Sequence, residues 1–289
     1  MLSPTRAVHL IIYGIHVPEW TAALGPGAPV WSEIPDATGV TIVPADRDPP
    51  PSPDDFPDGT LLIPLMEPHI RSRPRGFREL VPDIRVVDIL ADKRAFSDYM
   101  RAHALQQFAP HTYDSPDDAT FPCLVKRTNL NAGAGIVLLH DRAHLGKTLA
   151  APAWRGVDFI LQEFVACPTD YVTHAVCRGG TMIWDCTFAH APFEGDPIRR
   201  GGRKQASSVF HPPAHIRAQI ECFLRPLGYN GPCCIDYKIR PDGNVCVLEI
   251  NPRLGGSLMK PHNVSHLAGL LRCIIANAMH DAKLELAEV

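Results

Sequence analysis

The sequence predicts a protein of mixed helices and strands, of the α/β (α+β) class, in which a small unit precedes a larger one. Short apolar runs that end near glycine or proline predict strands, as at 7–13 and 61–65. An aspartate followed by apolar residues at helical spacing predicts a helix after residue 92. An apolar hairpin with acidic residues is predicted at 231–257. The 289 residues are enough for one large domain or two small ones.

The composition is that of an ordinary globular protein. Hydrophobic residues make up 45% and charged residues 20% of the chain, and a net charge of −3 gives no attraction to nucleic acid or to an anionic membrane. The apolar runs are too short to span a bilayer, and no small-residue cleavage site follows the first one. Nine cysteines without a CxxC spacing predict free thiols in a reducing compartment. We therefore expect a cytoplasmic protein without nucleic-acid or membrane partners.

The first part of the chain is predicted to be a small α/β unit. Strands are expected at 7–13, 40–43 and 61–65, with a proline-rich surface loop at 46–58. A fourth strand is expected at 84–89, and Asp92 then caps a helix that runs to about Leu105. We place a domain boundary near residue 90, which gives domains 1–90 and 91–289.

A loop of small residues at 128–135 lies between two predicted strands, 121–127 and 136–140. Gly133 and Gly135 allow the backbone to approach a ligand closely, and Lys126 at the end of the entering strand is suited to a phosphate. Most glycine-rich hairpin turns bind nothing, so the loop alone leaves both interpretations open.

The next apolar strand, 157–165, contains two polar residues, Gln162 and Glu163, and Asp170 follows it. An apolar strand edge that leads to a carboxylate suits an adenine and its ribose, although an ordinary central strand has the same pattern. Further along, the segment 192–211 carries the basic residues Arg199, Arg200 and Arg203. This segment is either a clamp on a γ-phosphate or carboxylate, or a solvated surface loop.

The stretch GPCCIDYKIRPDGNVCVLEINPRLGGS at 231–257 predicts two strands, 233–239 and 245–250, joined by a tight turn. Asp236 and Glu249 are separated by 249 − 236 = 13 residues through that turn, so they can lie side by side. Asn251 is two residues after Glu249 and shares its face of the sheet. One or two carboxylates, together with substrate phosphates, are typical of Mg²⁺ sites. The alternative is a structural hairpin whose acids face water.

The order of these signals resembles the ATP-grasp superfamily, which includes D-alanine–D-alanine ligase, biotin carboxylase and carbamoyl-phosphate synthetase. The resemblance covers roughly residues 85–260, and its most specific part is the EINPR sequence in the hairpin. It implies the ATP-grasp fold with a short Rossmann-like domain before it. It also implies a lid subdomain at about 115–165 and a catalytic subdomain at about 166–289.

The resemblance implies a role for each of the polar residues above. The residues that it places on ATP, where 131–135 forms a mobile lid, are Lys93, Lys126, Gly133, Gly135, Gln162, Glu163, Val165 and Asp170. Those that it places on Mg²⁺ (or Mn²⁺) are Asp236, Glu249 and Asn251. Arg253 and Lys126 would act on the transferred phosphoryl group. The sequence departs from the D-alanine ligases at two points, because Asp170 stands one residue later and Arg127 replaces a proline.

The activity that the resemblance implies is ATP-dependent ligation. Such enzymes transfer the γ-phosphoryl group to a carboxylate, and an amine (or, in some members, a thiol) attacks the acyl phosphate. The partners are then a small carboxylate, with Arg199, Arg200 and Arg203 as its candidate anchors, and a small amine; dimers are common in the family. Two alternatives stay open, namely a phosphotransferase that acts on a small molecule and a nucleotide-binding partner without turnover.

Overall fold

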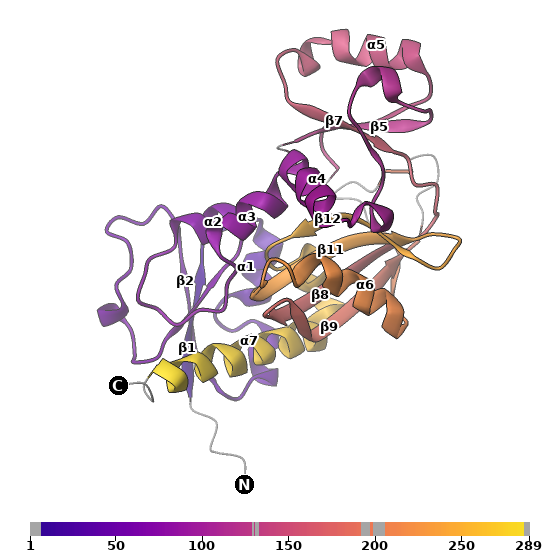
Figure 1. Ribbon diagram of the computed structural model, residues 1–289. Helices are drawn as coiled ribbons and strands as arrows, with labels where there is room; N and C mark the ends of the chain where they lie inside the picture. The colour runs from indigo at the N-terminus through magenta and orange to yellow at the C-terminus, as the bar shows by residue number, and fades with distance from the viewer. Residues whose placement is uncertain (1–6, 129, 131–132, 192–196, 199–205, 286–289) are drawn as a thin grey trace.

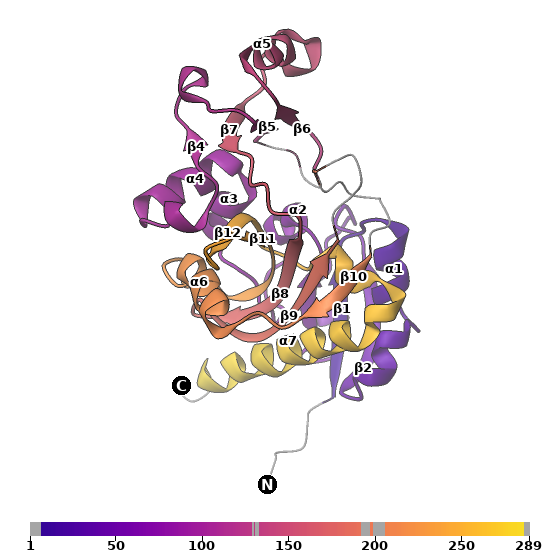
Figure 2. The ribbon, with the colours of Figure 1, turned by 90° about the vertical axis from the view of Figure 1, so that its right-hand side faces the viewer.

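The computed structural model describes residues 7–128, 130, 133–191, 197–198 and 206–285, and their strands form three sheets (Figure 1). The strand orders are β2-β1-β3, β4-β7-β5-β6 and β10-β9-β8-β11-β12, which we call the first, second and third sheets. Helix α4 (Lys93–Ala102) lies between the second and third sheets in both views and packs on α3 (Ile84–Ala91) (Figures 1 and 2). The predicted α/β class is confirmed.

The first sheet is parallel, as a Rossmann-like unit requires. It consists of β1 (Val8–Tyr13), β2 (Ala37–Val43) and β3 (Leu61–Pro64), with β1 in the middle. Helices α1 (Pro18–Leu24) and α2 (Glu67–Ser72) follow β1 and β3. Both helices therefore begin at the carboxyl edge of the sheet, where ligands bind in open α/β sheets.

The second sheet is small and antiparallel. Its strands are β4 (Thr112–Tyr113), β5 (Cys123–Arg127), β6 (Ile136–Leu139) and β7 (Phe159–Glu163). Helix α5 (Arg142–Ala150) connects β6 toward β7, and its Leu145 joins a separate small core with Val125 and Leu161. This sheet therefore has a core of its own, apart from the rest of the molecule.

The third sheet is antiparallel and is covered on both faces. Its strands are β8 (Asp170–Arg178), β9 (Thr181–His190), β10 (Ser207–Phe210), β11 (Gly231–Ile239) and β12 (Val245–Asn251). One face packs on α6 (Ala214–Leu224), α3 and α4. The other packs on α7 (Val264–Glu285) and shares a core with the first sheet. The first and third sheets are thus held together by one continuous apolar cluster.

The strand predicted at 84–89 is wrong, because α3 (Ile84–Ala91) occupies that segment. Asp83 caps it by accepting a hydrogen bond from the backbone N–H of Arg85 at 2.8 Å. Its buried residues, Val86, Val87 and Leu90, follow a helical spacing. The proposed boundary near residue 90 falls inside this helix and stays a prediction, as do the subdomain limits.

The helix predicted after Asp92 is confirmed as α4 (Lys93–Ala102). The Asp92 carboxylate accepts hydrogen bonds from the backbone N–H groups of Arg94 and Ala95, each at 2.9 Å. The helix ends before Leu105 because Ala104 has a φ of 54°, in the left-handed region. The cap fixes the start of α4, and therefore the position of Lys93.

All nine cysteines are free thiols. No helix in the described part of the chain is long and apolar enough to cross a bilayer.

Replacing the cap of α4 should weaken the fold by a measurable amount. We expect Asp92→Ala to lower the free energy of unfolding in urea by about 1 kcal/mol, because two backbone N–H groups lose their acceptor. Asp98→Ala, in an exposed 3.7 Å ion pair on the same helix, should change it by less than about 0.5 kcal/mol. Equal effects of the two variants would contradict this account of the cap.

Candidate nucleotide and metal site

The hairpin places its two carboxylates opposite each other, as predicted. Asp236 on β11 is the cross-strand partner of Glu249 on β12, and Cys234 is that of Asn251. Asp242 shapes the turn by accepting a hydrogen bond from the backbone N–H of Asn244 at 2.9 Å. Opposed residues of an antiparallel pair lie on one face, so the carboxylates share a face of the third sheet.

The amide of Asn251 joins this pair to an arginine. Its Nδ2 donates to Oδ2 of Asp236 at 3.3 Å, and its Oδ1 accepts from Nη2 of Arg253 at 3.2 Å. The donor set is therefore two carboxylates and an amide oxygen, which are hard ligands suited to Mg²⁺ or Mn²⁺. Among the described residues, no three His, Cys, Asp or Glu side chains are placed to hold a metal ion. The set fits a metal that also takes ligands from a substrate, and does not fit a closed protein cage.

Of the two predicted phosphate lysines, Lys126 interacts with a carboxylate of this pair and Lys93 interacts with Lys126. Lys126 on β5 is buried and donates to Oε1 of Gln162 on β7 at 2.5 Å. Lys93 at the start of α4 donates to the backbone oxygen of Leu130 at 2.5 Å. Lys126 interacts electrostatically with both Glu249 and Lys93. Residues of the second sheet, α4 and the third sheet therefore converge on one place.

Burial has a large effect on Lys126. Loss of hydration lowers its pKa to about 8, while the negative charge of Glu249 raises it and the positive charge of Lys93 lowers it. At neutral pH the lysine is charged, and an anion beside it would stabilise that charge. A phosphate is such an anion.

The two glycines of the glycine-rich loop lie in the left-handed region of backbone conformation, which favours glycine. Gly133 and Gly135 have φ values of 75° and 63°. A Cβ added to Gly135 would lie 2.8 Å from side-chain atoms of Arg127 and Leu130. The loop therefore packs tightly at this point, and its contact with phosphates stays a prediction.

At the predicted adenine end, two acidic side chains are held by basic residues of β11 and the turn after it. Both oxygens of Glu163 accept from Arg240 at 2.8 Å, and Asp170 pairs with Lys238 at 2.9 Å. The hydrogen bonds from Arg240 hold the pKa of Glu163 below its usual range. Val165 is buried. The nucleotide contacts of Gln162, Glu163, Val165 and Asp170 stay predictions.

Some predicted residues are not covered by the structure. Arg199, Arg200 and Arg203, the candidate anchors of the acid, lie outside the described residues, and so do Asn131 and Ala132 of the glycine-rich loop.

Three charged residues near the site were not predicted from the sequence. Lys238 and Arg240 follow Asp236 at intervals of two, so the strand period alone could have placed Lys238 on the same face. Glu67 pairs with Arg253 at 3.0 Å, and it begins the helix that follows β3. A polar residue just after a strand of a parallel sheet was the available signal for Glu67.

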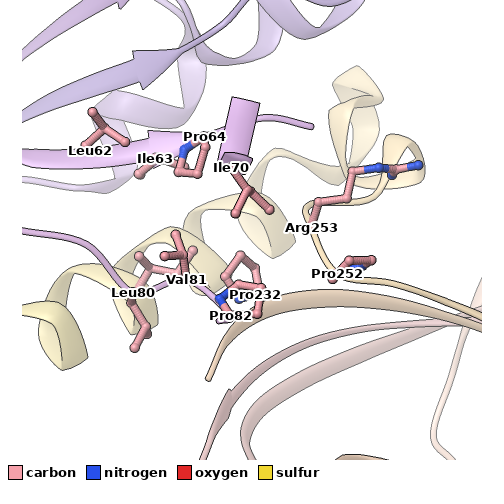
Figure 3. A pocket seen from close by; sticks show the side chains of 11 residues that line it. Leu62, Ile63, Pro64, Ile70, Leu80, Val81, Pro82, Pro232, Pro252 and Arg253 are labelled. Carbon is pink, nitrogen blue, oxygen red and sulfur yellow. The ribbon is translucent and has the colours of Figure 1, made fainter. Parts of the chain in front are cut away.

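A small cavity lies behind Arg253, between the first and third sheets (Figure 3). Its lining is apolar and includes Ile63, Ile70 and Pro232, and the guanidinium of Arg253 points away from these side chains. A volume of about 10 Å³ is at the lower limit for one water molecule, so the cavity is no substrate site.

Comparison with known proteins identifies the fold. No protein-family model matches the sequence, and no curated protein matches it. Solved structures do match. D-alanine–D-alanine ligase from Bacillus anthracis, complexed with ATP, has a TM-score of 0.64 and 14% identity, over 98% of this chain and 100% of that chain. L-amino acid ligase from Bacillus licheniformis has a TM-score of 0.58 and 15% identity, over 93% of this chain and 74% of that one.

A third matching structure is named for a ligase with a different substrate from the first two. Phosphoribosylamine–glycine ligase from Thermotoga maritima has a TM-score of 0.60 and 16% identity, over 89% of this chain and 70% of that chain. These structures share the ATP-grasp fold, so this chain has the ATP-grasp fold, and the resemblance of its sequence is confirmed at the level of the fold.

The burial of Lys126 predicts a pH dependence of stability. Between about pH 8 and 10.5 the unfolded chain keeps the Lys126 proton that the folded chain has lost, so stability rises with pH across this window. Relative to Lys126→Met, the wild type should gain up to about 3 kcal/mol from pH 7 to 10.5. Urea unfolding at several pH values measures this, with Lys147→Met, an exposed lysine of α5, as the matched control. A constant difference across the window would contradict the assignment.

Proposed function

We propose that this protein is an ATP-dependent ligase that activates a carboxylate as an acyl phosphate for attack by an amine. One observation carries the proposal. A buried lysine of the second sheet interacts electrostatically with Glu249, which is opposed to Asp236 on the third sheet. That combination of charges suits a nucleotide phosphate chain with its divalent cation. The fold supports it, since structures that match bear the names of D-alanine–D-alanine ligase and L-amino acid ligase.

The roles of the residues follow from their charges. Lys93 and Lys126 bind the phosphates of ATP as point charges. Asp236, Glu249 and Asn251 would hold Mg²⁺, which supplies charge neutralisation on the transferred phosphoryl group. Phosphoryl transfer needs little covalent chemistry from the protein, so its contribution is placement and electrostatic stabilisation.

Arg253 is assigned a role toward the acid. Its side chain lies next to the Asn251 amide, with Nη2 at 3.2 Å from Oδ1. We assign it the charge that develops on the acyl phosphate, before the amine displaces phosphate and closes the new bond. Arg199, Arg200 and Arg203 are proposed to bind the carboxylate substrate, and the nine free thiols fit a cytoplasmic protein.

A ligase, a phosphotransferase and a nucleotide-binding partner differ in the products that they form from ATP. Purified protein with ATP and Mg²⁺ would be supplied with a panel of amino acids and small carboxylates, with and without amines, while phosphate and ADP are measured. Amine-dependent release of phosphate with a condensed product supports the ligase. A stable phosphorylated product without amine would indicate a phosphotransferase, and nucleotide binding without ADP would indicate a binding partner.

Removal of one carboxylate of the pair should abolish turnover without unfolding the protein. We expect Glu249→Ala to reduce ATP-dependent phosphate release by about 100-fold or more, because the cation that would neutralise the phosphates loses a ligand. Asp242→Ala, an exposed carboxylate in the turn of the same hairpin, is the control and should retain activity. Circular dichroism checks the fold of both variants. Wild-type turnover by Glu249→Ala would exclude the metal assignment.

A further inference from the structure

One ion pair that joins the N-terminal segment to the end of β12 is buried. Nε of Arg253 lies 3.0 Å from Oε1 of Glu67, and the two side chains are 12% and 7% exposed. A second ion pair between the same parts of the chain, Lys260 with Glu19 at 2.7 Å, is 48% and 42% exposed. Burial of two charges is expensive, and an apolar pair of similar volume is often as stable. The buried pair therefore requires a reason other than stability.

The reason is visible in what else Arg253 contacts. Besides Glu67, it donates from Nη1 to the backbone oxygen of Leu254 at 2.9 Å and from Nη2 to Oδ1 of Asn251 at 3.2 Å. Asn251 in turn donates from Nδ2 to Asp236 at 3.3 Å. A continuous series of polar contacts thus runs from Glu67 to the carboxylate pair.

These contacts fix the plane of the guanidinium. Arginine has a long flexible side chain, but its planar fork has one orientation when Nε and Nη2 are both held. Of its five N–H groups, three are directed at these partners among the described residues. The role given to Arg253 above falls to the second N–H groups of Nη1 and Nη2.

Glu67 is itself held in place. It is the first residue of α2, directly after the short link from β3, and Pro68 stiffens the start of the helix. His16 and His69 lie close enough to interact with it electrostatically, and burial is the main cause that lowers the pKa of each. At neutral pH the imidazoles are therefore largely uncharged, and Arg253 is the cation that pairs with Glu67.

We propose that Glu67 is a positioning residue of the metal–nucleotide site. It holds the guanidinium of Arg253 and, through it, the amide of Asn251, whose Nδ2 donates to the Asp236 carboxylate and so orients that carboxylate. The first sheet, by way of α2, thereby supplies a part of the site formed by the second and third sheets. The inference rests on the proposed function, since it takes Asn251 as a metal ligand and Arg253 as a substrate contact.

The test measures metal binding and does not depend on turnover. Mn²⁺ is titrated into protein saturated with ADP, and free Mn²⁺ is read by electron paramagnetic resonance. Glu67→Gln should weaken Mn²⁺ binding by about 10-fold, because residues that orient metal ligands have effects of this size. The affinity for ADP without metal should stay the same. Glu19→Gln, in the exposed ion pair, should bind Mn²⁺ like the wild type.

A double-mutant cycle shows whether Glu67 acts through Arg253. In the background of Arg253→Gln, Glu67→Gln should weaken Mn²⁺ binding by less than twofold further, whereas independent or merely structural effects would multiply. The double variant leaves no unpaired buried charge, so it is the form to use if Glu67→Gln alone unfolds. Circular dichroism and the melting temperature report on folding.

Each outcome decides one question. Wild-type Mn²⁺ affinity in Glu67→Gln, or multiplied effects in the double variant, would overturn the positioning role. The expected 10-fold loss without any amine-dependent phosphate release in the substrate panel would support the positioning role and reject the ligase. A wild type whose ADP complex binds no Mn²⁺ would overturn both.

Discussion

Two carboxylates face each other across a pair of hydrogen-bonded strands and repel each other. The arrangement of the other charged groups of the site depends on this repulsion. Asp236 and Glu249 are direct cross-strand partners, where like charges are destabilising. The structure offsets the repulsion with groups from elsewhere. Asn251 donates a hydrogen bond to Asp236, and the charge of Lys126 attracts Glu249. A hard divalent cation between the carboxylates would remove what repulsion is left.

The two lysines of the site, Lys93 and Lys126, also repel each other, because both are positively charged. Lys126 is in addition deprived of water. A chain of phosphates satisfies both lysines, and its metal satisfies the carboxylates. A metal–nucleotide complex would therefore complement the charges of both halves of the site.

Local chemistry made the hairpin and α4 predictable from the sequence. The Pro-Asp-Gly turn predicts the hairpin, and counting 13 residues allowed Asp236 and Glu249 to lie side by side; a register shift between Asp236 and Tyr237 makes them direct partners. The aspartate cap located the start of α4. The segment 84–89 was mistaken for a strand because a short apolar run is ambiguous by composition, and the cap at Asp83 decides it.

Long-range pairs could not be predicted in the same way. Glu67 and Arg253 are 186 residues apart, and neither has a local pattern that names the other. The same holds for Arg240 and Glu163, separated by 77 residues. A sequence pattern shows which face or edge a residue occupies, but not which side chain from another sheet arrives there.

Arg240 connects the two halves of the site. The chain enters the second sheet near 109–111 and leaves it at Glu163, and Arg240 contacts both crossings, with Nη2 at 3.3 Å from the backbone oxygen of Ala109 and at 2.8 Å from Oε2 of Glu163. Glu163 also accepts from the backbone N–H of His111 at 3.0 Å. One guanidinium directly after β11 therefore joins both crossings to the hairpin, and Arg94 of α4 adds a second link by donating to the backbone oxygen of Phe159 on β7 at 2.7 Å. Since Lys126 lies on β5 and Glu249 on β12, these links help to hold the two side chains near each other.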